Sequence, residues 1–448
     1  LDKCLERYLG IAPAPDHSRS DWGSMFLTED QLAYAARDVF HLQALSNKLW
    51  GELEHEGLDR VARLEFDLVP VLVEMEAAGI AVDPDKLRAI QDKGRAQAAE
   101  HAALLRQKFN LPRLNPGSPA QLLEALRAAG INLENTTEDT LKAADDGELI
   151  PLILAFRGAE KLAQQAGSLL DCVKHDGRIH GHFDATGTAT GRFASKEPNL
   201  QNVGRGELRE CFVPKPGHKL IVADYSQIEL RVAAVIAGEK KMMEAYKAGI
   251  DLHRQTAAEV LGKPLEAVTK DDRRLAKAVN FGLIYGQSAP GLVNYAASNY
   301  EVDLELQEAE RIRRQFFRTY DRLRQWHGVS RNKADEGARE VRTVLGRRRL
   351  IPETASEWER FTALVNMPVQ GGSADGMKQA LVLLAERLPA DAHILSTVHD
   401  EVIVEVPEAK AVEVRDLVQS TMIEAMATLF PQVPIEVEAG VCAHWGEK

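Results

Sequence analysis

The chain has 448 residues, of which 45% are hydrophobic and 27% charged, and its formal net charge is −12. This length predicts several domains rather than one. The composition is ordinary for a soluble globular protein. The sequence contains no apolar run of membrane-span length, which argues against a membrane protein. The negative net charge argues only weakly against a nucleic-acid partner, because phosphate binding depends on local basic clusters. Such clusters occur at 273–277, 311–325 and 346–349.

The first part of the chain, residues 1–62, ends in the helical pattern LTEDQLAYAARDVFHLQALSNKLW, whose Thr-Glu-Asp start predicts a capped N-terminus. The chain begins at Leu1 within what already reads as a domain interior, so we expect a fragment of a longer protein. The four scattered cysteines show neither metal-site spacing nor a disulfide framework, which favours a reducing cytoplasm.

Residues 63–175 are mostly helical in pattern, with a short extended piece at GIAVDPDKL and a helix that starts near Ser118 and closes at Gly130. From residue 176 a Thr/Gly-rich alternating stretch predicts strands and turns, and HKLIVADYS predicts a buried strand. Residues 240–335 are again helical. AHILSTVHDEVIVEVP predicts two strands around a His-Asp turn, and PIEVEAGVCAHW predicts a last strand. The pattern predicts an α+β fold in which helices flank a sheet of non-consecutive strands.

The stretch VADYSQIELR places Asp224 where an apolar strand stops, so that its carboxylate can reach a cleft. Asp224 alone could equally be a turn residue. Ser226 and Glu229 have the spacing of a capping box, so the structural alternative for Glu229 is a bond to a backbone N–H at the start of a helix.

A second carboxylate, Asp400, lies in STVHDEVIVEV. Aspartate is common in hairpin turns, but three titratable residues together are more than a turn requires. Sequence spacing does not show whether Asp224 and Asp400 meet. If they do, the two carboxylates could bridge two Mg²⁺ ions, which prefer oxygen ligands and activate phosphoryl chemistry.

The stretch DDRRLAKAVNFGLIYGQS repeats functional side chains at every fourth position: Arg273, Lys277, Phe281 and Tyr285. On a helix these four share one face. Cations followed by aromatic rings suit a nucleotide, with phosphates on the cations and the base on the rings. A half-buried amphipathic helix with cations at its rim is the structural alternative.

Taken together, these three stretches resemble motifs A, B and C of the family A DNA polymerases, the DNA polymerase I family. DYSQIELR resembles motif A, RRLAKAVNFGLIYG motif B and VHDE motif C. Four more stretches resemble the family in its order: TGRFASKEPNLQN, DLHRQTAAEVLG, TVLGRRRLIP and NMPVQGGSADGMKQAL. The resemblance covers about residue 63 to the end. It implies a DNA-directed DNA polymerase with a right-hand fold, used in replication or repair.

The resemblance also implies a division into domains: 63–175 as the thumb, 176–238 and 340–448 as the two parts of the palm, and 239–339 as the fingers. Residues 1–62 resemble the C-terminal end of a DnaQ-like 3′–5′ exonuclease domain. Its last motif would be YAARD, with Tyr34 and Asp38 as metal-site residues, although a polar pair on a surface helix explains them as well. Residues 1–62 contain no Asp-x-Glu for that domain's first motif, so we expect no proofreading by this chain.

The resemblance assigns roles to individual residues. It implies that the catalytic metal site consists of Asp224, Asp400 and the backbone carbonyl of Tyr225. Glu229 would crowd a ribose 2′-hydroxyl, a role compatible with a capping box. Phe281 in place of Tyr would disfavour dideoxynucleotides. The full nucleotide-binding set would be Ser226, Gln227, Ile228, Glu229, His253, Arg273, Lys277, Phe281 and Tyr285. The DNA-binding set would be Arg157, Lys161, Arg192, Asn199, Gln201, Asn202, Asn366, Gln370 and His399.

Two departures, Thr362 where many relatives carry Arg and Ala194 in place of Ser, concern template handling. The implied cofactors are two Mg²⁺ ions, with Mn²⁺ as a substitute. The implied partners are primer–template DNA and deoxynucleoside triphosphates, for a cytoplasmic monomer away from membranes. Three alternatives remain at this point: a nuclease fragment, a non-catalytic primer–template binding module, and an enzyme that copies RNA.

Overall fold

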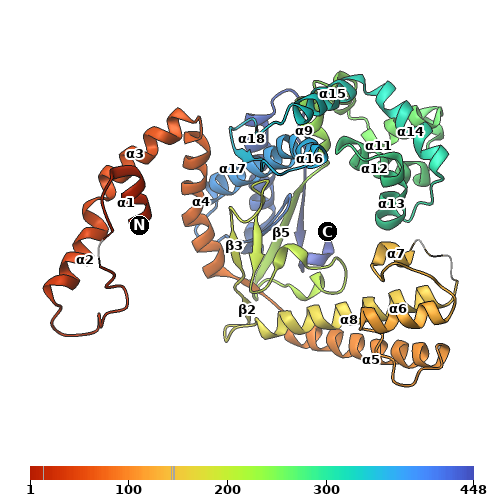
Figure 1. Cartoon of the computed structure of the whole chain (residues 1–448), viewed down its shortest axis with the longest axis horizontal. Coiled ribbons are helices and arrows are strands. Elements are labelled where there is room, and N and C mark those ends of the chain that lie inside the picture. Colours follow the sequence, from red (N-terminus) through yellow and green to blue (C-terminus); the bar gives the residue numbers. More distant parts are fainter. Residues whose placement is uncertain (14, 143, 145–146) are drawn as a thin grey trace.

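The computed structural model describes residues 1–13, 15–142, 144 and 147–448. At its centre lies a four-stranded antiparallel sheet in the order β10-β5-β9-β8 (Figure 1). These strands are β5 (His218–Tyr225), β8 (His393–Val398), β9 (Glu401–Pro407) and β10 (Val437–Cys442). The structure confirms the buried strand, the pair around the His-Asp turn and the last strand that the sequence predicts.

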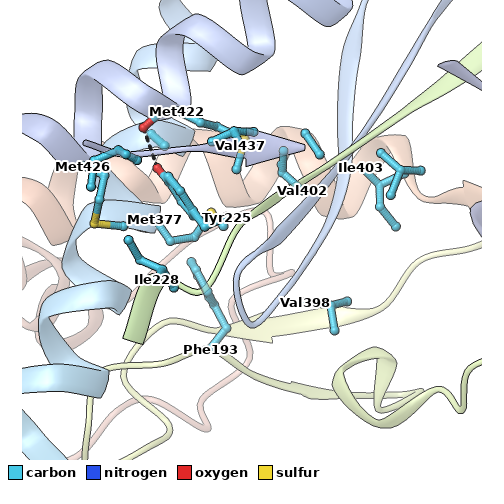
Figure 2. Close-up of a cluster of buried hydrophobic side chains, with 14 of the residues drawn as sticks. Phe193, Tyr225, Ile228, Met377, Val398, Val402, Ile403, Met422, Met426 and Val437 are labelled. Atoms are coloured by element: carbon cyan, nitrogen blue, oxygen red, sulfur yellow. Dashed lines mark hydrogen bonds between the residues drawn. The ribbon is translucent and has the colours of Figure 1, made fainter. Parts of the chain in front are cut away.

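The central strand β5 is buried because its apolar residues pack on both faces. Leu220, Ile221, Val222 and Ala223 are fully buried, as expected for a strand between two others and beneath helices. At the end of β5 the Tyr225 ring lies among Met422, Met426 and Met377 (Figure 2), and its hydroxyl donates a 2.7 Å hydrogen bond to the Met422 carbonyl. The strand end is therefore fixed from the core side.

Helices from distant parts of the chain cover the sheet (Figure 1). Contacts join α17 with α18 and α4, α18 with β5, and α4 with β8. The bounds of these helices, with α9 and α16, are α4 (Asp59–Ala78), α9 (Ile228–Ala237), α16 (Glu357–Asn366), α17 (Gly372–Arg387) and α18 (Ala411–Leu429). A π-helical segment, Met367–Gly371, joins α16 to α17.

Two long helices, α5 and α8, pack side by side below the sheet in Figure 1. They approach closely at Gly94, where an added Cβ would lie 3.0 Å from the Ala163 side chain. Ser118 caps the next helix, as the sequence predicts, through a bond from the Gln121 amide. The bounds are α5 (Pro84–Lys108), α6 (Pro119–Ala128), α7 (Glu138–Lys142) and α8 (Leu149–Asp171).

A second helical group lies opposite α6 and α7 (Figure 1). It consists of α10 (Lys240–Lys247), α11 (Leu252–Leu261), α12 (Lys270–Ile284), α13 (Ala289–Tyr300), α14 (Leu306–Thr319) and α15 (Asp321–Asp335). The two groups touch at their tips, because Ser298 Oγ on α13 donates a 2.9 Å hydrogen bond to Asp139 Oδ1 on α7. The two helical groups are thus joined away from the sheet by a side-chain hydrogen bond.

The first helices, α1 (Asp2–Leu9), α2 (Glu29–Phe40) and α3 (Leu42–His55), extend away from the sheet at the left of Figure 1. Thr28 caps α2 in a capping box with Gln31, which confirms the predicted capped start. Large apolar side chains stay exposed here, with Met25 at 89% and Phe26 at 82%. This part contacts the rest mainly through the junction of α3 with α4.

Short strand pairs complete the fold: β1 (Ile80–Ala81) with β2 (Arg178–Ile179), β3 (His182–Asp184) with β4 (Ala194–Lys196), and β6 (Glu340–Arg342) with β7 (Arg348–Leu350). Along the part of the chain that the structure describes, every helix is either too short or too polar to cross a membrane. Helix α4 runs through the expected boundary at residue 62, whereas the boundaries at 175, 238 and 339 fall between elements. The domain boundaries stay predictions.

Candidate active site

The two aspartates that the sequence singles out meet at one end of the central sheet. Asp224 is the second-last residue of β5 and pairs in register with Glu401 at the start of β9. Asp400 closes the turn between β8 and β9, and its carbonyl accepts a 3.0 Å hydrogen bond from the Tyr225 amide. Residues 176 positions apart in the sequence (400 − 224) are thus neighbours in the fold.

The electrostatics of this pair favour a cation. Burial, helped by the charges of Asp224 and Glu229, raises the pKa of Asp400 to about 6, although a backbone hydrogen bond and Arg192 act in the opposite direction. A like charge close to a buried carboxylate disfavours ionisation, and a bound cation reverses that effect. In the structure, the Lys448 ammonium forms an ion pair with Asp224. The Asp224–Asp400 pair is therefore a place where positive charge is stabilised.

The donors available at this pair suit a hard divalent cation. Two carboxylates and the backbone carbonyl at Tyr225 are oxygen ligands, and Mg²⁺ is held in proteins by one or two carboxylates together with waters and substrate phosphates. Among the described residues, no group of three or more His, Cys, Asp or Glu side chains forms a metal cage. The residues present fit an ion whose remaining ligands come from substrate and water.

Glu229 does not form the predicted capping box, and that interpretation was wrong. Helix α9 begins at Ile228, and its N-cap is Gln227 in a left-handed conformation with φ of 53°, without a side-chain capping bond. The Ser226 amide donates instead to the Glu436 carbonyl. This bond continues the backbone pairing by one residue beyond the end of β5 at Tyr225, so the N-cap of α9 falls on Gln227 rather than on Ser226.

The Glu229 carboxylate is instead held by two other segments of the chain. It accepts hydrogen bonds from the Tyr285 hydroxyl and from the Arg192 guanidinium. Burial, then the charge and hydrogen bond of Glu229, raise the pKa of Tyr285 well above its ordinary value, so the phenol remains a donor. Glu229 therefore joins three segments: α9, the end of α12 and the β3–β4 connection.

The cationic and aromatic face predicted on 273–285 is present on α12. Arg273 Nε donates a 2.8 Å hydrogen bond to Asp251 Oδ2, whereas no described carboxylate lies within ion-pair distance of Lys277. Burial, followed by the charges of Arg273 and Arg205, lowers the pKa of Lys277. The helix ends at Ile284, so Tyr285 is its C-cap. The repulsion between these cations favours an anion on this face.

His253 on α11 lies beside this face and is buried, with 2% of its surface exposed. Asn280 Nδ2 donates to its Nδ1 at 2.9 Å, which leaves the proton of the neutral ring on Nε2. Burial lowers the pKa of His253 to about 4. Its ring lies 5.9 Å from that of Phe281. His253 is thus a fixed, neutral donor next to the α12 face.

Gln201 braces the turn that carries Asp400. Its Nε2 donates a 2.6 Å hydrogen bond to the Thr397 carbonyl, and its Oε1 accepts from the His399 amide at 3.2 Å. His399 has a φ of 58°, a conformation that costs energy outside glycine. The bidentate Gln201 side chain offsets this cost and fixes the turn.

The other predicted DNA-binding residues fall into two groups. Near the site, Asn199 and Asn202 are exposed on the short helix after β4, and Asn366 and Gln370 lie at the junction of α16 and α17. The Asn366 Oδ1 atom is buried without a hydrogen-bond partner among the described residues. An unsatisfied acceptor of this kind is suited to a donor on a ligand.

Arg157 and Lys161 lie on α8, the helix that packs on α5. The Arg157 guanidinium is already bonded to the Thr136 carbonyl and hydroxyl. Lys161 is exposed. In α2, Tyr34 is near His17 and Trp22, and Asp38 is exposed, so this pair is not brought near the other predicted residues. The DNA and exonuclease roles of these four residues stay predictions.

Sequence reasoning missed one buried ionic cluster, which joins the turn between β6 and β7 to α17. Arg347, Asp375 and Lys378 lie in two stretches that resemble the family, but the sequence analysis predicts no individual role for them. In the structure, Asp375 and Lys378 are fully buried. Charged residues three positions apart on an otherwise apolar helix are a signal that could have found them, because such groups are almost never fully buried unless paired.

Comparison with known proteins identifies the family. The model of DNA polymerase family A matches residues 84–447, and that of a 3′-5′ exonuclease matches residues 1–54. DNA polymerase I of Aquifex aeolicus is 34% identical over 99% of this chain and 81% of its own length. DNA polymerase I of Pseudomonas aeruginosa is 37% identical over all of this chain, which spans only 52% of that relative.

A solved structure has the same fold. The POL domain of Pol1 from M. smegmatis, in complex with DNA primer-template and dNTP, superposes with a TM-score of 0.84 at 31% identity over 99% of this chain and 78% of that one. The chain belongs to DNA polymerase family A. Its fold is the right-hand fold of a DNA-directed DNA polymerase, preceded by a short exonuclease-like piece.

Proposed function

We propose that this chain extends a DNA primer on a DNA template by adding deoxynucleoside monophosphates to the 3′-hydroxyl and releasing pyrophosphate. The observation that carries the proposal is the convergence of Asp224 and Asp400 at the end of the central sheet. The next helix, α9, carries Glu229, whose bond from Tyr285 links it to the end of α12, the helix with the Arg273–Lys277 face. In the proposed complex, the two carboxylates would hold the cations and the side chains of α12 would contact the phosphates of the same triphosphate.

The triphosphate would lie along α12. Lys277 has no ion-pair partner among the described residues and would donate to a phosphate oxygen, as would the Nε2–H group of His253. Arg273 would exchange its Asp251 partner for phosphate. Charge-assisted bonds of this kind are stronger than neutral ones. The three donors would hold the α-phosphorus in line with the primer hydroxyl.

The sugar and base would meet Glu229, Phe281 and Tyr285. A carboxylate fixed by Tyr285 and Arg192 leaves little room for a 2′-hydroxyl, so deoxynucleotides would be preferred. The Gln201-braced turn would hold His399 and Asp400 against the primer terminus. Each of these groups is positioned before substrate arrives.

Two divalent cations, Mg²⁺ or Mn²⁺ in its place, would be held by Asp224, Asp400 and the Tyr225 carbonyl. When bound there they supply a lowered pKa at the attacking hydroxyl and stabilise charge on the leaving oxygen. Primer–template DNA and deoxynucleoside triphosphates are the partners that we propose. We also propose the division into thumb (63–175), palm (176–238 and 340–448) and fingers (239–339), in a cytoplasmic monomer.

The test is primer extension with a labelled primer, Mg²⁺ and four deoxynucleotides, on matched DNA and RNA templates. We expect extension on DNA that EDTA abolishes. Binding of primer–template without extension would leave only a binding module. Shortening of single-stranded DNA without nucleotides would instead indicate a nuclease.

A further inference from the structure

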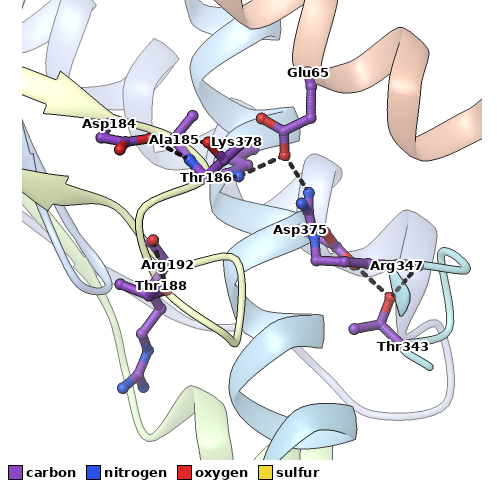
Figure 3. Close-up of polar contacts among 10 residues, drawn as sticks. All are labelled: Glu65, Asp184, Ala185, Thr186, Thr188, Arg192, Thr343, Arg347, Asp375 and Lys378. Carbon is purple, nitrogen blue, oxygen red and sulfur yellow. Dashed lines mark hydrogen bonds and ion pairs between the residues drawn. The ribbon is translucent and has the colours of Figure 1, made fainter. Parts of the chain in front are cut away.

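A cluster of two acidic and two basic side chains lies where three elements meet (Figure 3). Glu65 comes from α4, Arg347 from the turn between β6 and β7, and Asp375 and Lys378 from α17. Arg347 bonds Asp375 at 2.6 Å and Glu65 at 2.5 Å, and Lys378 bonds Glu65 at 2.5 Å. Two acids and two bases make the cluster neutral.

The cluster is buried enough for its cost to require an explanation. Asp375 and Lys378 are fully buried and Arg347 is 9% exposed. Burial lowers the pKa of Lys378 to about 8, so the ammonium depends on its carboxylate partners. Buried ion pairs are often no more stabilising than apolar residues of the same volume, and their specific geometry is then the property that they add.

What this cluster holds is the 185–193 loop, the connection between β3 and β4. Lys378 Nζ donates a 2.7 Å hydrogen bond to the Ala185 carbonyl and lies 5.4 Å from the Phe193 ring centre. At Gly191, whose φ is +80°, an added Cβ would lie 2.6 Å from Arg347 Cδ. Both ends of the loop therefore rest on the cluster.

The same loop carries Arg192, which pairs with Glu229. Within the loop, Thr188 Oγ1 donates a 2.8 Å hydrogen bond to the Arg192 carbonyl, which stiffens the segment next to that pair (Figure 3). A continuous set of contacts thus runs from Lys378 and Arg347, through the loop, to Arg192, Glu229 and Tyr285.

We propose that Lys378 and Arg347 are positioning residues that fix the 185–193 loop so that Arg192 holds Glu229 at the sugar of the incoming nucleotide. They touch no substrate. The inference rests on the proposed function, because nucleotide selection is its readout. It assigns to a buried ionic cluster an effect on sugar discrimination rather than on folding alone.

The test compares Lys378→Met and Arg347→Lys with wild type in single-nucleotide incorporation, under conditions where thermal unfolding shows each variant folded. For Lys378→Met we expect KM for the deoxynucleotide to rise, and its preference over the ribonucleotide to fall, each about tenfold, the factor that corresponds to ~1.4 kcal/mol. Primer–template affinity should stay within about threefold, because neither residue contacts the proposed DNA path and Arg192 is only one of the nine proposed DNA-binding residues. Arg347→Lys, which keeps the charge, tests the same expectation with a smaller effect if Lys378→Met does not fold.

The matched control is Arg178→Met, which removes another ion-paired cation, partly buried with 14% of its side chain exposed. Arg178 bonds Glu405 and the Ala78 and Gly79 carbonyls and, among the described residues, has no bond to the loop. This variant should lower thermal stability and leave sugar preference unchanged. In an Arg192→Ala background, Lys378→Met should change the preference little further, because both act through one contact. The inference would be overturned by any of three results. The first is unchanged sugar selectivity in folded Lys378→Met and Arg347→Lys, and the second is an equal change of selectivity in Arg178→Met. The third is an effect of Lys378→Met that adds fully to that of Arg192→Ala. Failure of wild type to extend any primer would instead contradict the proposed function.

Discussion

Glu229 shows how one side chain can be assigned two different roles by its sequence context. Its carboxylate accepts hydrogen bonds from Tyr285 and Arg192 and makes no capping bond. We expect Glu229→Ala to reduce the preference for deoxynucleotides over ribonucleotides by about tenfold or more, because a site that excludes a hydroxyl by a fixed group loses that exclusion on truncation. Incorporation of each nucleotide by the purified variant measures the change.

The control for this prediction is Glu229→Gln, which keeps the volume and should retain most of the sugar preference. A variant Glu229→Ala with the wild-type preference would contradict the selector role. The capping role is already excluded by the backbone, which places Gln227, not Ser226, at the N-cap.

The two candidate catalytic aspartates could be singled out from the sequence, whereas the interactions around them could not. Asp224 and Asp400 each follow an apolar run that predicts a strand, and this local pattern can be recognised in the sequence. The turn that carries Asp400 is supported by Gln201, and the loop that carries Arg192 is supported by Lys378, in both cases through bonds between residues far apart in the chain. Propensity and periodicity carry no information on such long-range pairs. The capping-box interpretation of Ser226 and Glu229 was wrong for the same reason, because the Ser226 amide pairs with the distant Glu436 carbonyl.

At the scale of elements, α15 is anchored to α12 by a buried histidine. His327 Nε2 donates a 2.9 Å hydrogen bond to the Ile284 carbonyl, and burial lowers the pKa of His327 to about 4, assisted by the charges of Arg313 and Arg331. The unfolded chain, with a pKa near 6.5, binds a proton that the native state excludes between these values. The stabilisation is therefore complete above about pH 6.5 and is lost as the pH falls towards 4.

We predict that this histidine contributes a loss of about 2 kcal/mol in the free energy of unfolding between about pH 7.5 and pH 5.0. Denaturant unfolding at both pH values should show the loss in wild type and show it reduced by this amount in His327→Gln. His393→Gln, at an exposed position on β8, is the control. An identical pH dependence in wild type and His327→Gln would contradict the assignment.

The strands themselves were predictable, but their order was not. The β5, β8, β9 and β10 segments have clear apolar patterns, and a two-residue turn indicates the β8–β9 pairing. The insertion of β5 between β9 and β10 is a long-range pairing that brings residue 224 beside residue 401. Only the fold, or resemblance to a family with that fold, supplies this information.

At the scale of the whole molecule, α1–α3 form an appendage with few bonds to the rest. The junction consists of the Trp50–Phe66 ring contact, the Arg63–Trp50 stacking and the bonds of Arg342 and Arg348 to Glu56. Exposed ion pairs of this kind each contribute only ~0–1 kcal/mol.

We therefore predict that removal of residues 1–57 leaves primer extension by the remaining chain within about twofold of that of the full chain. Steady-state extension and thermal unfolding of the two proteins measure the effect, with equal primer–template affinity as the internal control. A loss of extension in a folded shortened chain would show that α1–α3 support the site from a distance.

The central claim is that Asp224 and Asp400 together hold the cations that drive nucleotide addition. Single-turnover extension of a bound primer, at saturating Mg²⁺ and deoxynucleotide, tests it in Asp224→Ala and Asp400→Ala, with primer–template affinity measured for the same proteins. We predict that each variant binds DNA within about threefold of wild type and loses extension by a factor of about 10³ or more. Near-normal extension by either variant would contradict the claim.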